Sequence, residues 1–389
     1  MNPEPLEYRA GRERGERIDA ELAGRYLAHT RIGDPAADAV IEAARDVPRE
    51  VGQRWFQAGI EGGAAAIPDA PEVVRNFFSE IDVVPDWFDL NAVRPGCRAF
   101  HRHSEMFVGA FVGAVLIEGF STLISKSFSI TGRLVDQGTN RLKQNNRHLL
   151  EIFMPGGLDR HSDGWKLSVR IRLVHARVRW LLKRAPDWDE AAWGVPLSSA
   201  HIAFATAAFS GLLLKRAEML GVRLSAEERE SFILVWRYAG RLMGVSDELL
   251  FDSERSALKL HAVGAACEPP PGLDSILLAN GLINSAPIVA GITDPVARRK
   301  LTAKIYRISR ALIGNEMADA LNYPPTSTLG VLSLLQWRNR LDAVAQKVVP
   351  GMAHRRRAGQ FQQMLDVSHY ESLGIGYRLP ERVYAETET

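Results

Sequence analysis

The chain has 389 residues, of which 46% are hydrophobic and 24% are charged, a composition typical of a globular protein and not of a disordered one. Its formal net charge of +2 is too small for the basic footprint of a nucleic-acid-binding protein, so we expect no nucleic-acid partner. The two cysteines, Cys97 and Cys267, make neither a disulfide framework nor a zinc site, and they suit a reducing compartment.

No targeting or membrane-spanning segment is expected. Residues 1–14 are polar and charged and lack the apolar region of a signal peptide. The longest apolar run, 106–124, is interrupted by Glu118, Ser121 and Thr122, so it predicts a buried helix and not a transmembrane span. These features favour a cytoplasmic location.

The first part of the chain predicts a flexible arm over residues 1–15 followed by a series of helices. A helix over 35–45 is indicated by Asp34, a suitable N-cap residue, and by Pro35 at the first helical position. Further helices are expected over 16–28, 49–60, 72–78 and 95–122, the last being long and apolar.

The remaining chain continues the helical period. Pro155-Gly156-Gly157 ends a helix over 131–153, and Ser225 with Glu228 forms a capping box. Helices are also expected over 163–183, 198–220, 225–244, 246–264, 273–282, 293–320 and 328–347. The sequence thus predicts an all-α protein, with an N-terminal arm and first helix (1–30), one large helical domain (31–349, core about 95–260) and a C-terminal tail (350–389).

The helix over 163–183 carries the clearest candidate site. Arg172, His175 and Arg179 lie at positions −3, 0 and +4, which share one helix face. A neutral imidazole can ligate a metal, and flanking guanidinium groups can bind carboxylates. Haem b would supply an iron for the first and two propionates for the second. Arg170 could reach a propionate but lies off this face.

A different interpretation of the same helix needs no cofactor. Histidine on a buried helix is more often a core residue than a ligand, and Arg172 and Arg179 could simply pair with acidic side chains.

An ordered series of motifs extends beyond this helix. It consists of Asn140-Arg-Leu-Lys-Gln-Asn-Asn146, Pro155-Gly-Gly-Leu158, Gly164-Trp165, Arg170-x-Arg-x-x-His175-x-x-x-Arg179, Trp193-Gly-Val-Pro196, Phe209-Ser210 and Trp236-Arg-x-x-Gly240-x-x-x-Gly244. Over residues 95–260 the series resembles the family that unites latex-clearing protein, a bacterial rubber oxygenase, with the fungal MpaB-type oxygenases.

This resemblance implies a globin-like helical core that binds haem b, with His175 as the axial ligand of iron. It also implies that the preceding helix supplies the distal side, where the rubber oxygenases have an arginine, a lysine and a threonine. The corresponding residues are Arg141, Gln144 and Asn145. The two amides can donate hydrogen bonds, but neither can act as a titrating proton donor.

The resemblance therefore implies a haem-dependent oxygenase that uses O₂ on an apolar small molecule such as an isoprenoid. Two alternatives stay open: a non-catalytic haem protein such as a gas sensor or carrier, and a scaffold without cofactor. Glu118 could be a distal base or a buried carboxylate paired with an arginine. His148, three residues after Asn145, could reach the distal pocket or pack in the core. The sequence does not predict an oligomeric state.

Overall fold

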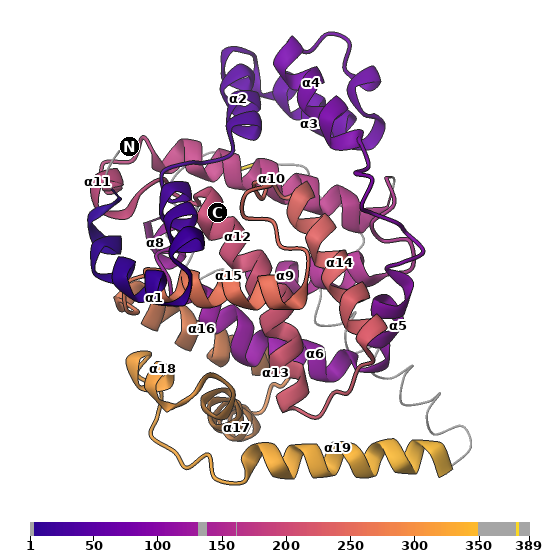
Figure 1. The fold of residues 1–389 in the computed structure, drawn as a ribbon, viewed down its shortest axis with the longest axis vertical. Helices are drawn as coiled ribbons and strands as arrows, with labels where there is room; N and C mark the ends of the chain where they lie inside the picture. The colour runs from indigo at the N-terminus through magenta and orange to yellow at the C-terminus, as the bar shows by residue number, and fades with distance from the viewer. Residues whose placement is uncertain (1–3, 131–137, 161, 349–378, 381–389) are drawn as a thin grey trace.

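The computed structural model describes residues 4–130, 138–160, 162–348 and 379–380; side chains are not described for 138–143 and 340–348. Within these residues every regular element is a helix and none is a strand, which confirms the predicted all-α class. The molecule is elongated, with α2–α4 at one end, α17–α19 at the other, and α9, α10 and α12–α15 between them (Figure 1).

The bounds of the first half of the helices follow. They are η1 (Leu6–Tyr8), α1 (Arg9–His29), α2 (Pro35–Ala43), η2 (Ala44–Asp46), α3 (Arg49–Gly62), η3 (Ala64–Ala66), α4 (Glu72–Asp82), α5 (Arg94–Arg102), α6 (Ser104–Ala110), η4 (Phe111–Val115), α7 (Leu116–Phe120), α8 (Ile124–Ile130) and α9 (Gly138–Phe153).

The second half begins with the helix that carries the candidate histidine. Its elements are α10 (Asp163–Leu182), α11 (Glu190–Trp193), α12 (Ser199–Ala207), η5 (Ala208–Leu212), α13 (Leu213–Met219), α14 (Ala226–Leu242), α15 (Glu254–Cys267), α16 (Leu273–Val289), α17 (Pro295–Ile313), α18 (Asn315–Ala320) and α19 (Val331–Val348).

The predicted flexible arm over residues 1–15 is wrong from Leu6 onward, where the chain is helical. Tyr8 is fully buried, and its hydroxyl donates to the buried Glu268 carboxylate at 2.9 Å. Tyr26 of the same N-terminal segment donates to Glu268 at 2.8 Å. The polar composition of this segment gives no signal of its docking, because the contacts use two tyrosine hydroxyls and the close approach of Gly11 to the Cys267 carbonyl.

The predicted helix over 95–122 is several helical pieces. α5 and the α6–α7 segment are bent by 86° at His103, whose φ of −120° and ψ of 23° leave the helical region. Within the second segment η4 is a π-helical turn. In the described part of the chain no single helix is long and apolar enough to cross a membrane, and only this bent pair matches a span by composition.

Three other boundaries differ from expectation. The helix predicted over 246–264 begins only at Glu254, because Ser253 caps it by accepting from the Ser256 N–H. The one predicted over 293–320 is divided at Gly314, whose φ of 90° ends α17. The one predicted over 273–282 continues to Val289, with Pro287 accommodated in its last turn.

Candidate functional site

A tight connection positions α10 against α9. A Cβ built on Gly157 would lie 1.9 Å from the carbonyl oxygen of Glu151, and one built on Gly164 would lie 2.4 Å from that of Gly157. Only glycine permits these approaches. The Pro155-Gly156-Gly157 turn ends α9, as predicted, and brings the two helices into direct contact.

His175 lies in the middle of α10 as a half-buried residue. Burial, and then the positive charge of Arg179, lower the pKa of its imidazole to about 4, although Asp34 opposes the shift. Among the residues that the structure describes, none hydrogen-bonds the buried Nδ1 atom. The ring is thus neutral at physiological pH, which is the form that binds a metal. Its Nδ1 atom remains able to form a hydrogen bond.

The two flanking arginines are bound to carboxylates of α2. Arg172 donates to Asp34 through Nε (2.5 Å) and Nη2 (2.9 Å). Arg179, only 2% exposed, donates from Nε to both oxygens of Asp38 at 2.8 and 3.0 Å and from Nη1 to the Leu197 carbonyl at 2.6 Å. The acidic pairing that the sequence left open is therefore present for both residues.

These contacts do not test whether Arg172 and Arg179 bind the propionates of a haem, so that role stays a prediction. The buried Nη2 atom of Arg179 has no hydrogen-bond partner in the described chain, so one donor is unused. Arg170, the third predicted propionate partner, is half-buried on α10.

The predicted distal residues lie on α9, along one helical stripe with His148. Arg141, Gln144, Asn145 and His148 have the spacing i, i+3, i+4 and i+7. Gln144 is exposed and Asn145 is half-buried, whereas the side chain of Arg141 lies outside the described residues. The stripe becomes more buried toward His148, which is 7% exposed.

His148 joins this stripe to α10. Its Nε2 atom lies 2.9 Å from the Ser168 hydroxyl, which in turn donates to the Gly164 carbonyl at 2.8 Å. Burial, and then the nearby His175, lower the pKa of His148 to about 3. His148 and His175 are therefore neighbours on the packed helices α9 and α10. Of the two positions expected for His148, the structure shows the one in which it packs in the core.

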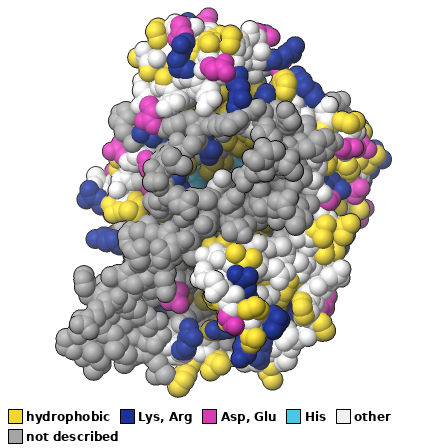
Figure 2. Space-filling view, turned by 180° about the vertical axis from the view of Figure 1, so that it is seen from behind, with side chains coloured by type: hydrophobic (Ala, Val, Ile, Leu, Met, Phe, Trp, Pro, Cys, Tyr) yellow, Lys and Arg dark blue, Asp and Glu magenta, His cyan; other side chains and the backbone are white. Residues whose placement is uncertain are grey.

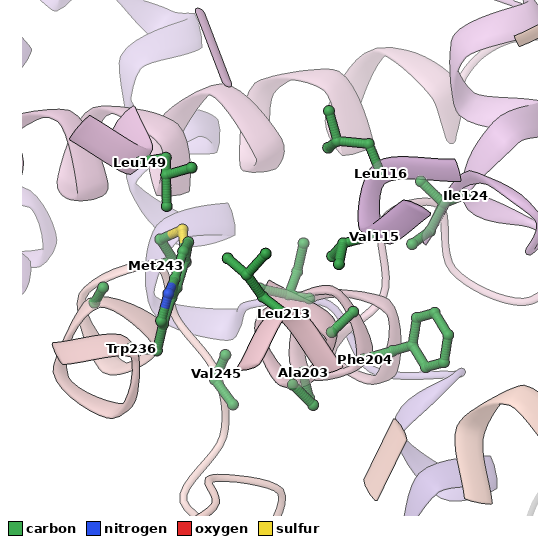
Figure 3. Close-up of a cluster of buried hydrophobic side chains, with 14 of the residues drawn as sticks. Val115, Leu116, Ile124, Leu149, Ala203, Phe204, Leu213, Trp236, Met243 and Val245 are labelled. Carbon is green, nitrogen blue, oxygen red and sulfur yellow. The ribbon is translucent and has the colours of Figure 1, made fainter. Parts of the chain in front are cut away.

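An apolar cluster lies beside these helices. Figure 3 shows Leu149 of α9, Leu213 of α13 and Trp236 of α14 with side chains turned toward a common centre, together with residues of η4, α7, α8 and α12. Trp236 is 1% exposed, and within the described chain its Nε1–H has no hydrogen-bond partner. Its indole packs between His148 and Phe209, with centroid distances of 6.1 and 5.5 Å. The cluster is the part of the hydrophobic core that packs against α9 and α14.

Seen from behind, histidine surface is visible near the centre of the molecule (Figure 2). Across the described ranges, no three His, Cys, Asp or Glu side chains gather as a metal-binding cluster. A haem iron needs only one imidazole from the protein on its proximal side, so His175 alone is sufficient for that kind of site.

Glu118 belongs to a buried ion pair away from the α9 stripe. Its carboxylate accepts from Arg216 Nε at 3.0 Å and from Nη2 of the same residue, and both side chains are largely buried. Burial raises the pKa of Glu118, against the lowering effect of Arg216. The arginine-paired carboxylate, one of the two interpretations of Glu118, is the one observed.

Sequence reasoning missed two features of the site. Asp34 was recognised only as an N-cap, although Asp34 and Asp38 are spaced i, i+4 and so match a cation pair on another helix. Ser168 was not singled out, because a serine within a helix gives no signal until the helix that faces it is known.

The fold and this arrangement define an all-helical protein with a half-buried histidine on a central helix, a buried histidine on the neighbouring α9 and an apolar cluster beside them. The chain belongs to the family described as ER-bound oxygenase mpaB/B'/rubber oxygenase, catalytic domain, which matches residues 97–341. The predicted family is confirmed, and the oxygenase class follows from it.

Two known proteins are similar to the chain. The rubber oxygenase of Streptomyces sp. (strain K30) is 26% identical over 326 residues, which span 79% of this chain and 74% of that protein. The structure of latex clearing protein LCP in the closed state superposes with a TM-score of 0.66 at 22% identity, covering 86% of this chain and 91% of that chain. The second comparison shows a shared fold.

Proposed function

We propose that this protein is a haem b-dependent oxygenase in which His175 is the axial ligand of iron. The observation that carries the proposal is the His175 imidazole, which is held neutral on a buried helix with its Nδ1 atom unpartnered among the described residues. A neutral histidine near a buried apolar cluster fits a haem, because the macrocycle is itself large and apolar. Bound haem would supply the redox chemistry that activates O₂.

The chain's own residues would then hold α10 in place and orient His175. The Asp34–Arg172 and Asp38–Arg179 pairs fix α10 to α2 on either side of His175, so they limit rotation of the ligand helix. The His148–Ser168 hydrogen bond fixes the distance between α9 and α10. Arg141, Gln144 and Asn145 are proposed to face the distal side, where the amide N–H groups would donate to a ligand with partial negative charge.

The substrate that we propose is an apolar small molecule of the isoprenoid kind, whose oxidation consumes O₂. Its support is the family and the apolar cluster of Figure 3, to which η4, α8, α9 and α14 contribute side chains. The distal amides do not titrate and the Arg141 guanidinium keeps its protons, so any proton transfer would have to come from water or from the substrate. The buried free thiols Cys97 and Cys267 agree with a cytoplasmic location, which we also propose.

A second function is favoured by the distal amides themselves. Gln144 and Asn145 offer hydrogen bonds without proton chemistry, which suits a protein that binds a gas or carries haem without turnover. Optical spectra separate a haem protein from a scaffold: the haem-loaded wild type should show a Soret band, and His175→Ala should lose or shift it. Retention of an unchanged band in His175→Ala would exclude the assigned ligand.

Turnover separates the two haem functions. O₂ consumption should rise when an isoprenoid oligomer is added to the haem-loaded protein, with formation of carbonyl products. A stable O₂ complex without consumption across a panel of isoprenoid and other apolar substrates would instead favour the sensor or carrier.

A further inference from the structure

α19 lies as a separate helix along one end of the molecule, where it crosses near α13 and α17 (Figure 1). Polar contacts contribute to its attachment: the side-chain amides of Gln336 and Asn339 donate to the carbonyls of Met219 and Leu220 at 2.9 and 2.7 Å. Leu332 and Leu335 pack against the core from the same side. The described side chains on the inner face of α19 therefore contact the rest of the molecule.

Over residues 331–339, the part of α19 whose side chains the structure describes, the opposite face carries two large apolar side chains that are open to solvent. Leu334 is 65% exposed and Trp337 is 60% exposed, and their i, i+3 spacing places them side by side on the helix. Leu329, just before the helix, is 89% exposed. Large side chains with this exposure, gathered on one helix face, mark an interaction surface more often than chance exposure does.

The segment that contains α17 and α19 is basic. Between residues 291 and 340 the sequence has eight Lys and Arg and three Asp and Glu, although the whole chain has a net charge of only +2. α17 packs against α19 and presents a solvent-facing stripe at the helical period. The stripe consists of Val296, Arg299, Lys300, Lys304 and Arg307.

The two helices are tied together at this end. Arg307 donates from Nε to the Ser327 carbonyl at 2.8 Å, in the segment that leads into α19. Arg338, next to Trp337, is also exposed. Seen from behind, hydrophobic and Lys or Arg side chains are intermixed at the lower end of the molecule (Figure 2). In the sequence a further basic run, Arg355-Arg-Arg357, follows α19.

We propose that α19 and the basic stripe of α17 form a docking surface for an anionic phospholipid bilayer. Tryptophan and leucine on the outer face of a helix insert at the boundary between headgroups and acyl chains, while lysine and arginine stems reach the phosphates. Each basic residue near an anionic surface adds attraction that salt screens. The chain would bind reversibly, because two or three side chains are a small apolar anchor.

The charge excess distinguishes a bilayer from a second copy of the chain. Two copies related by a two-fold axis would place the same basic stripe on each side of the interface, where like charges repel. A bilayer with anionic lipids neutralises the stripe instead. This inference does not depend on haem or on oxygenase activity.

Vesicle flotation of the full chain tests the proposal. We expect binding to phosphatidylcholine vesicles that contain one-quarter phosphatidylglycerol, weak binding to phosphatidylcholine alone, and loss of binding in high salt. Leu334→Ser with Trp337→Ser should weaken binding by about tenfold or more, since both side chains would otherwise leave water. Lys300→Ala and Lys304→Ala should each weaken it about fivefold.

A matched control uses two exposed valines far from α19 in the fold. Val83 and Val84 are 60% and 53% exposed in the segment after α4, near the opposite end of the molecule. Val83→Ser with Val84→Ser should leave vesicle binding unchanged, and circular dichroism should show that all variants are folded. Equal loss of binding in both double variants, or no binding of the wild type to anionic vesicles, would overturn the proposal. So would a dimer in light scattering that Leu334→Ser with Trp337→Ser converts to a monomer.

Discussion

Arg172 and Asp34 form a two-point ion pair that joins α10 to α2, with Nε–Oδ2 and Nη2–Oδ1 distances of 2.5 and 2.9 Å. Asp34 also caps α2 by accepting from the Ala37 N–H at 3.2 Å. One carboxylate thus serves as a helix cap and as the partner of the arginine one turn before His175. Both side chains are largely buried, so the pair is sensitive to the loss of either partner.

Asp34→Ala should therefore lower the free energy of unfolding by about 3–5 kcal/mol, because it leaves the Arg172 charge buried and unpaired. The measurement is urea denaturation of wild type and variant. Asp46→Ala is the control: Asp46 lies 4.0 Å from Arg45 in an exposed pair, and its loss should cost less than about 1 kcal/mol. Similar losses in the two variants would contradict the role of the buried pair.

Ser168→Ala should cost about 1–3 kcal/mol, since the buried His148 Nε2 loses its partner at 2.9 Å. Ser210→Ala is a matched control, because Ser210 is fully buried but bonds only the Ala207 carbonyl of its own segment. In a haem-loaded protein Ser168→Ala should also broaden the optical bands while Ser210→Ala does not. A smaller destabilisation in Ser168→Ala than in Ser210→Ala would show that the α9–α10 link is unimportant.

His261 gives a pH prediction outside the candidate site. Burial, and then Arg216 and Lys215, lower its pKa from 6.5 to about 4, and its ring stacks on Phe204 with centroids 4.8 Å apart. Between pH 6.5 and 4 the unfolded chain binds a proton there and the folded chain does not. Stability should accordingly fall as the pH falls through this window, and it should change no further below about 4 through this group.

His261→Gln removes that proton uptake. The dependence of the free energy of unfolding on pH between 6.5 and 4 should become shallower by up to about 1.4 kcal/mol per pH unit. Denaturant titrations at a series of pH values measure the slope. An unchanged slope would mean that His261 is protonated in the folded protein.

Glu268→Ala should release the N-terminal helix. The buried carboxylate accepts from Tyr8, from Tyr26 and from the Leu123 N–H at 3.0 Å. Its removal leaves Tyr26 and the Leu123 N–H without this acceptor, while the Tyr8 hydroxyl keeps the His201 Nε2 atom 2.9 Å away. We expect a loss of about 3–5 kcal/mol and faster proteolytic cleavage within α1. Glu7→Ala, at an exposed position beside Tyr8, should change neither quantity.

Gln144→Leu tests the proposed distal donor. If haem binds through His175, loss of one amide donor should speed dissociation of O₂ from the reduced protein by about tenfold, the equivalent of one hydrogen bond to a charged group. Stopped-flow spectroscopy measures the rate. Glu105→Ala on α6, an exposed position on another helix, should not alter it. Unchanged O₂ dissociation in Gln144→Leu would place Gln144 away from bound ligand.

The sequence alone determined the helical class, the position of α10 and the face that carries Arg172, His175 and Arg179. These follow from local rules: helical periodicity, the Pro155-Gly156-Gly157 stop and side-chain spacing act over a few residues. The ordered motifs also determined the family, because their order and spacing are properties of the sequence itself.

Only the tertiary structure decided what these side chains contact. Asp34 and Asp38 lie more than a hundred residues before their arginine partners, and Ser168 meets His148 across a helix interface. Tyr8 likewise contacts Glu268, which lies 260 residues later in the sequence. Because of this contact, the segment that was expected to be a flexible arm is a helix packed against the core. Which side chains pair with one another depends on how the helices pack. Packing is the sum of many weak apolar contacts between distant residues, and these cannot be predicted from local sequence patterns.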